Sequence, residues 1–352
     1  MKKHYKLFIL LLIIPLASFA NGDKFAHSKQ KNIKKTYLVN SDAGIQIDNS
    51  YGSISLSTWD EDKIDISVTI KVSGNNENWV NQKLDDITVD INALKSLVSA
   101  KTIIGKTSSR SSGNNNNFEI NYSIKIPKKG GIKLTNKYGN IVTTDLWSNT
   151  DIYCKYGKIT LGKLNSTANT IRIEYCNDSS IDAINSGIIT AKYSELDINK
   201  VTKLALTTDY TNTNIQEANA VYYTSKYGSI KIQDIKTLEG TGNYLKIKIG
   251  TILDAFKINT KYSDVTIANL KTDVVEITSA YTNVSLGYLA AYAFDFDVAV
   301  RYANFNYDRE LEVISKEETN NSKNFKGYYK SRGVNKINIS SDFGNVSLIK
   351  KQ

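Results

Sequence analysis

The segment IKLTNKYGNIVT, residues 132–143, decides the fold because its central tyrosine belongs to a pattern that recurs along the chain. Ten tyrosines follow one another at steps of 18, 19, 18, 17, 17, 17, 18, 19 and 21 residues. A period this regular is typical of a solenoid, in which each repeat buries its apolar face only against neighbouring repeats. The ten are Tyr138, Tyr156, Tyr175, Tyr193, Tyr210, Tyr227, Tyr244, Tyr262, Tyr281 and Tyr302.

The residues around each tyrosine predict two strands joined by a corner. Apolar and β-branched residues recur four positions before the tyrosine and three and five positions after it, which suits strands. The alternation slips by one residue across the tyrosine, so the backbone must bend or bulge there. The next residue is small in nine of the ten copies and glycine in three of them, and we expect it to permit the bend.

The same frame appears near both ends of the chain, around Tyr51 and around Phe343. The sequence therefore predicts an all-β fold, a single-chain parallel β-solenoid or β-helix with about twelve rungs of 17–21 residues. Residues 131–307 are expected to form the regular solenoid. Residues 308–352 are expected to supply a C-terminal loop and a final rung that caps this end.

Residues 36–130 are predicted as an N-terminal β region with the first rung and a capping insertion, since bare strand edges at a solenoid end invite aggregation. Apolar residues after Asn76 fall at helical spacing and indicate a short helix. Two polar segments without periodicity, 106–117 and 316–324, are predicted as loops. The expected regular elements are strands at 64–72, 87–91 and 118–126 and the helix at 77–86.

Residues 1–20 have the pattern of a secretory signal peptide. Lysines precede an apolar run from Leu7 to Leu16, and Ser18 and Ala20 occupy the positions that a signal peptidase reads. That run is too short for an ordinary membrane span, and no transmembrane segment is expected in the mature chain. The protein is therefore predicted to be exported, to the periplasm, the cell surface or the medium.

The formal charge of +10 is concentrated near the N-terminus. Three lysines within residues 1–20 and a net +4 between Gly22 and Lys35 leave about +3 for residues 36–352. Residues 21–35 are predicted as a basic linker. Because the rest of the chain is nearly neutral, no nucleic-acid partner is expected.

Side chains suited to catalysis are scarce. His27 is the only histidine after the initial segment, which argues against Ser-His-Asp and Cys-His sites and against most zinc sites. No cofactor or metal is expected. Cys154 and Cys176 are offset by three residues in adjacent rungs, roughly 10 Å along a strand, whereas bridged α-carbons lie within about 7 Å. Two apolar core side chains are thus favoured over a disulfide.

Two rows of surface residues, one of lysines and one of tyrosines, can each be interpreted in two ways. Lys155, Lys192, Lys226 and Lys261 each precede a tyrosine and recur at every second rung, as a candidate binding stripe for an anionic glycan. The alternative is a solvated edge in which alternating charges relieve repulsion between rungs. The tyrosine row is either a structural ladder of stacked rings, which we favour, or a platform for sugars.

Several repeats resemble a known family. The motifs are KYGNI at 137–141, KYGKITL at 155–161, KYGSIKI at 226–232 and DFGNVSL at 342–348. They are similar to the putative adhesin family of exported bacterial β-solenoid proteins, akin to head GIN-domain proteins. The stretches at 51–74 and 118–127 look like the same family, so the resemblance covers roughly 36–349. It implies a solenoid outside the cytoplasm and supplies no catalytic residues.

The sequence thus favours a non-catalytic exported cell-envelope β-solenoid that acts as an adhesin-like binding or scaffold module. A glycan and a cell-surface protein are both candidate partners. One alternative is a polysaccharide-active lyase or glycosidase, for which Glu195, Asp197 and Asp264 are candidate acids spread over distant rungs. A second alternative is a structural subunit that stacks end to end.

Overall fold

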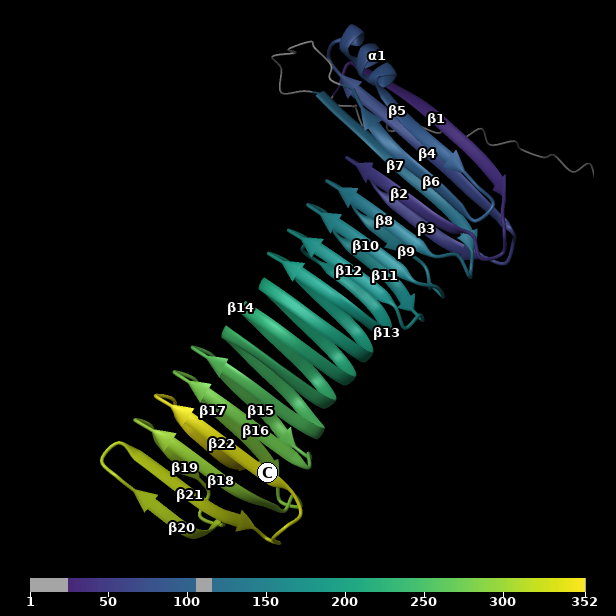
Figure 1. Cartoon of the computed structure of the whole chain (residues 1–352). Helices are drawn as coiled ribbons and strands as arrows, with labels where there is room; N and C mark the ends of the chain where they lie inside the picture. Colours follow the sequence, from purple (N-terminus) through teal and green to yellow (C-terminus); the bar gives the residue numbers. More distant parts are fainter. Residues whose placement is uncertain (1–24, 106–115, 352) are drawn as a thin grey trace, which may run out of the picture.

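The computed structural model describes residues 25–105 and 116–351, which form an elongated all-β stack with one short helix at its N-terminal end (Figure 1). The all-β class and the helix expected over 77–86 are confirmed, since α1 spans Glu77–Asp86. The side chain of Asn76 caps α1 by accepting a hydrogen bond from the backbone N–H of Trp79 at 3.0 Å. The predicted signal peptide and residues 106–115 of the first predicted loop lie outside the described residues.

Each repeat is a pair of strands that meet at a tyrosine, and successive pairs stack in parallel as solenoid-like rungs. We call the strands before the tyrosines the leading face and those after them the trailing face. On the leading face, Ile152 lies between Leu134 and Ile171 of the adjacent rungs. The core fills the space between the two faces, and these three side chains are fully buried.

The leading face contains β2 Gly44–Ser50, β5 Ile87–Ala93, β6 Leu97–Ile104, β8 Ile132–Lys137, β10 Thr150–Lys155, β12 Asn169–Glu174, β16 Val274–Ala280, β18 Phe294–Arg301, β20 Glu312–Glu318, β21 Ser322–Tyr329 and β22 Lys336–Asp342. The trailing face contains β1 His27–Leu38, β3 Ile54–Trp59, β4 Lys63–Gly74, β7 Asn116–Pro127, β9 Ile141–Thr143, β11 Ile159–Leu164, β15 Asp264–Leu270, β17 Asn283–Leu289, β19 Phe305–Tyr307 and β23 Val346–Lys351. Two longer runs, β13 Ser179–Lys192 and β14 Glu195–Lys261, contribute to both faces.

The corner is made by the tyrosine itself. All ten tyrosines of the repeat have φ between 48° and 58°, in the left-handed region that side chains other than glycine rarely adopt. This bend accounts for the one-residue slip in the alternation. We expected the residue after the tyrosine to be small so that the backbone could bend there. In the structure it is small because it packs closely against the backbone of the preceding rung. A Cβ atom on Gly139 would lie 1.8 Å from the carbonyl oxygen of Gly52.

The rung of Tyr175 departs from the repeat frame by one residue. The frame expects Asp178 and Ser180 to face the core, but Ser179 and Ile181 are the buried residues. Asp178 itself adopts a φ of 54° and absorbs the additional residue. Ile181 is thereby placed in register with Ile198 of the next rung.

The N-terminal end is closed by antiparallel strands. Strand β1 pairs with β4 over its whole length, so the linker predicted over 21–35 is wrong from His27 onward. Half-buried and exposed residues alternate along the first part of β1, as expected for a strand packed on one side. Lys29 faces α1, where its Nζ donates to Glu77 at 2.9 Å and to Asn81 at 2.7 Å.

The last rung in the sequence does not lie at the end of the stack. Strand β22 pairs in parallel with both β16 and β18, and β23 pairs with both β17 and β19. In Figure 1 the yellow strand β22 accordingly lies between the green strands β16 and β18. The prediction that this rung caps the end is therefore wrong. The antiparallel strands β20 and β21 lie there instead, and they occupy most of the second predicted loop, 316–324.

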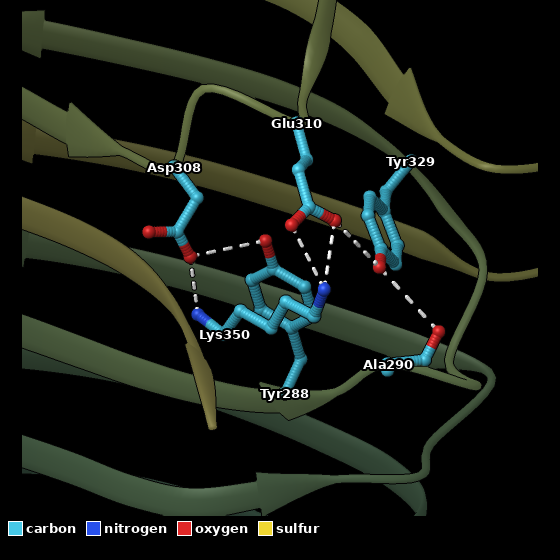
Figure 2. Close-up of polar contacts among 6 residues, drawn as sticks. All are labelled: Tyr288, Ala290, Asp308, Glu310, Tyr329 and Lys350. Carbon is cyan, nitrogen blue, oxygen red and sulfur yellow. Dashed lines mark hydrogen bonds and ion pairs between the residues drawn. The ribbon is translucent and has the colours of Figure 1, made fainter. Parts of the chain in front are cut away.

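Polar contacts hold the inserted rung in place (Figure 2). The Nζ of Lys350, in β23, lies 2.9 and 2.8 Å from the two carboxylate oxygens of Glu310. The backbone N–H of Lys350 donates to Asp308, which also accepts a hydrogen bond from the buried hydroxyl of Tyr288 at 3.2 Å. The hydroxyl of Tyr329 donates to Glu310 at 3.3 Å. These contacts connect β17, β21 and β23.

Candidate functional site

The tyrosine row forms a stacked ladder along one edge of the molecule. From Tyr138 to Tyr281, neighbouring ring centroids lie 4.5–5.1 Å apart, with interplanar angles of 4–19°. Tyr51 extends the ladder at one end, and Phe343 followed by Tyr302 extends it at the other. Because each ring covers the face of the next, solvent reaches mainly ring edges and hydroxyl groups. Sugars need an open aromatic face, so this geometry favours the structural ladder over the platform.

Serine and threonine residues that follow ladder tyrosines form hydrogen bonds with backbone N–H and carbonyl groups at the corners. Ser194 Oγ donates to the carbonyl oxygen of Lys192 at 2.7 Å and accepts from the N–H of Cys176 in the preceding rung at 3.1 Å. Ser263 and Thr282 repeat the arrangement, since Thr282 accepts from the N–H of Ser263 at 3.0 Å. This role explains why serine and threonine replace glycine after several tyrosines, since unpaired buried N–H groups are costly.

The four predicted lysines lie on the leading face beside the ladder, but in different electrostatic settings. Lys155 is ion-paired with Glu174 of the next rung at 2.9 Å and lies 5.2 Å from the ring centroid of Tyr156. Its hydrogen bond holds the pKa of the Glu174 carboxyl below the usual value. Lys192, Lys226 and Lys261 are exposed, and within the described chain none of them has an ion-pair partner within 4.0 Å.

The candidate acids of the enzyme alternative are not brought together. Asp197 lies on the trailing face, where it accepts a hydrogen bond from Asn214 at 2.8 Å. The rungs of Glu195 and Asp264 are four steps apart, roughly 19 Å at about 4.8 Å per step. Across residues 25–105 and 116–351, no three His, Cys, Asp or Glu side chains gather in a way that could hold a metal ion. No helix in these ranges is long and apolar enough to cross a membrane.

A groove on the outer surface of the leading face was not anticipated from the sequence. It consists of three open hollows of about 390, 440 and 590 Å³. The first and second hollows share Ala168 and Thr170, and the second and third share Ala205 and Tyr222. The groove therefore runs along the stack from β2 to β16. It crosses ten leading-face strands, or roughly 43 Å at about 4.8 Å per step.

The charged residues that line the groove sum to no net charge. Its charged lining residues are Lys133, Asp151, Lys203, Glu239, Lys257 and Glu276. Two opposite pairs among them lie close together, Lys133 with Asp151 at 3.9 Å and Lys257 with Glu276 at 3.5 Å. The predicted lysine stripe does not line the groove. For the third hollow, the sequence signal is the outward position three residues before the tyrosine, where threonine recurs.

The cysteines are buried free thiols. The three-residue offset is confirmed, because Cys154 pairs in register with Ile173. The expected separation is wrong, since the chain turns at Tyr175 and brings Cys176 Sγ to 3.4 Å from the carbonyl oxygen of Cys154. A hydrogen bond with Cys176, together with burial, raises the pKa of the Cys154 thiol.

Comparisons with known proteins give a consistent but distant likeness. No family model and no curated protein matches the sequence. The chain is similar to the crystal structure of a "putative adhesin" from Parabacteroides merdae, with 10% identity, 73% of this chain and 96% of that chain covered and a TM-score of 0.42. A "putative adhesin" from Parabacteroides distasonis has 11% identity, with 73% of this chain and 97% of that chain covered and a TM-score of 0.39. A "putative adhesin" from Bacteroides fragilis has 11% identity, with 91% of this chain and 97% of that chain covered and a TM-score of 0.29. At such TM-scores and identities, the likeness by itself assigns neither function nor ligand.

Proposed function

We propose that this protein is a non-catalytic, exported module of the cell envelope that binds a surface polymer in the manner of an adhesin. Its scaffold in this proposal is a parallel β-solenoid of about twelve rungs, as expected for a chain with this repeat. The observation that carries the proposal is the groove on the leading face. A surface that continues over ten strands suits the retention of a linear chain, whereas catalysis concentrates reacting groups at one bond.

The location follows from the N-terminal sequence. The signal-peptide pattern of residues 1–20 supports export, and the mature chain would then meet glycans and surface proteins rather than nucleic acid. The stacked rungs supply a rigid rod on which a long binding surface can be displayed.

The test is a polymer-binding screen of the mature protein together with an assay for release of reducing sugar from the same polymers. We expect binding to at least one polymer with no product release. Product release that grows with time would replace the binding module with an enzyme. A protein that binds no glycan and no cell-surface preparation would contradict the proposal altogether.

The lysine stripe is a separate proposal for an anionic ligand. Its exposed contacts would each contribute about 0.2–1 kcal/mol, and binding would weaken as salt shortens the Debye length below about 10 Å. The variant K155Q/K192Q/K226Q/K261Q should then lose binding to anionic glycans with little change in Tm. Unchanged binding in this variant would leave the row as a solvated edge, which the ion pair between Lys155 and Glu174 favours.

A further inference from the structure

We infer that the groove of the leading face is the ligand site and that its ligand is an extended, uncharged polysaccharide. This inference rests on the proposed function and names the binding surface and the ligand class within it. Three features of the groove carry it: its charge balance, its row of hydroxyl groups and its exposed apolar side chains.

The charge balance selects against a charged polymer. The lining residues of the three hollows include three lysines and three carboxylates. Asp151 lies within ion-pair distance of both Lys133 and Arg172, and Lys257 lies within ion-pair distance of Glu276, so these opposite charges offset one another. A polyanion or polycation would meet no net attraction along this path, whereas an uncharged chain would incur no electrostatic penalty.

The hydroxyl row matches a ligand rich in hydroxyl groups. Four exposed threonines line the third hollow three residues before a ladder tyrosine, and each can donate and accept one hydrogen bond or more. They are Thr207, Thr224, Thr241 and Thr278. Parallel rungs advance by about 4.8 Å, so Thr207, Thr224 and Thr241 offer the same polar group at three successive steps of the third hollow, and Asn259 occupies the step before Thr278. A repeating sugar chain can use such a row without a specific register.

Apolar side chains supply the other half of carbohydrate recognition. Tyr222 is 40% exposed at the junction of the second and third hollows, and it is outside the stacked ladder. Lys203 Nζ lies 5.9 Å from the centroid of this ring, and no aromatic ring of the described chain stacks on it, so we infer that one face can meet the C–H face of a sugar. Ile188, 56% exposed, extends the apolar surface into the second hollow.

The experiment measures retardation of the mature protein in native gels that contain soluble polysaccharides. The uncharged panel includes β-1,3-glucan, mixed-linkage glucan, galactomannan and arabinoxylan, and the anionic panel includes polygalacturonate and hyaluronate. Two groove variants are compared with wild type: Tyr222→Ala, which removes the ring, and Ala205→Arg, which places a long side chain between two hollows. Trp147→Ala is the matched control, since Trp147 is 54% exposed and does not line the groove.

We expect at least one uncharged polymer to retard the wild type. The apparent Kd should rise at least tenfold in both groove variants and stay unchanged in Trp147→Ala and in the quadruple lysine variant. Retardation should persist when salt is raised to about 500 mM, where exposed charges are largely screened. Circular dichroism and Tm should show that the groove variants remain folded, as expected for exposed positions.

Other outcomes overturn the inference and separate it from the proposed function. Binding confined to anionic polymers, lost in high salt and in the quadruple lysine variant, would retain an adhesin-like module but move the site to the lysine stripe. Binding to uncharged polymers that is unaffected in both groove variants would retain the module and refute the groove. Binding to a surface protein but to no polysaccharide would refute the ligand class alone.

Discussion

The ring of Tyr302 stacks on that of Phe343, with 4.9 Å between the centroids, although the preceding tyrosine of the repeat is Tyr281. Tyr281 stacks on the opposite face of Phe343 at 4.8 Å. Phe343 of the C-terminal rung therefore lies in the ladder between Tyr281 and Tyr302. Backbone bonds accompany the rings, since Tyr281 N–H donates to Asp342 and Phe343 N–H donates to Arg301, both at 2.8 Å.

This arrangement predicts unequal effects at the two aromatic positions. Phe343→Ala removes two stacked pairs, whereas Tyr302→Ala removes only one within the described ladder. At about 0.5–1.5 kcal/mol per pair, the first variant should lose roughly twice as much stability as the second. Denaturant unfolding of both variants measures the difference. A smaller loss for Phe343→Ala would contradict the inserted position of the last rung.

The left-handed φ of the ladder predicts which replacements are tolerated. Tyr210 has a φ of 48°, which asparagine accepts far more readily than a β-branched residue. Both Tyr210→Asn and Tyr210→Val remove the stacking, but valine adds backbone strain of about 1–2 kcal/mol. Tyr210→Val should therefore be the less stable variant by that amount in thermal unfolding. Equal stability would mean that the corner relaxes to another conformation.

The repeat assignment predicts that substitutions at inward positions cost much more stability than substitutions at outward positions. Ile258 is 5% exposed, so Ile258→Asp should cost at least about 3 kcal/mol by burying an unpaired charge. Asn283 is exposed, and its side-chain oxygen accepts from the N–H of Asn345, a role that aspartate can keep. Asn283→Asp should cost under about 0.5 kcal/mol. Similar decreases in Tm for the two variants would refute the assignment.

The contact between Glu310 and Lys350 predicts a pH-dependent contribution to stability. The hydrogen bond from Lys350 lowers the pKa of Glu310 in the folded state. The contribution is therefore fully present above the unfolded pKa, about 4.3, and is lost as the pH falls through the lower folded pKa. Lys350→Met should lower Tm at pH 7, and the difference from wild type should shrink in acid. Lys351→Met is the control, because Lys351 has no ion-pair partner within 4.0 Å in the described chain.

The burial of the two thiols predicts that they are alkylated much more readily in the unfolded protein than in the folded one. Cys154 is buried and its pKa is raised, so iodoacetamide should leave it unmodified in the folded protein at about pH 8. After unfolding without reductant, intact mass should show that both Cys154 and Cys176 carry an adduct. A pair that resists alkylation in the unfolded state would demonstrate a disulfide and would contradict the free thiols of this structure.

The amino-acid sequence determined the features that depend on local and periodic chemistry. Spacing between the tyrosines determined the rung length, and the slip in alternation located each corner, because strand side chains alternate with a period of two. The Asn76 cap and helical spacing likewise located α1. These properties reside in neighbouring residues or in a repeat, so they can be read without knowing which strands pair.

Only the tertiary structure decided which rungs are neighbours. Nearly identical strand edges can pair in more than one order, and contacts such as Arg301 with Asp342 and Lys350 with Glu310 form only when β22 and β23 are inserted. The close approach of Cys176 to Cys154 depended on the direction of the chain after a corner. The groove depended on the stacking of many strands, because each hollow is lined by side chains from separate rungs and belongs to no single segment.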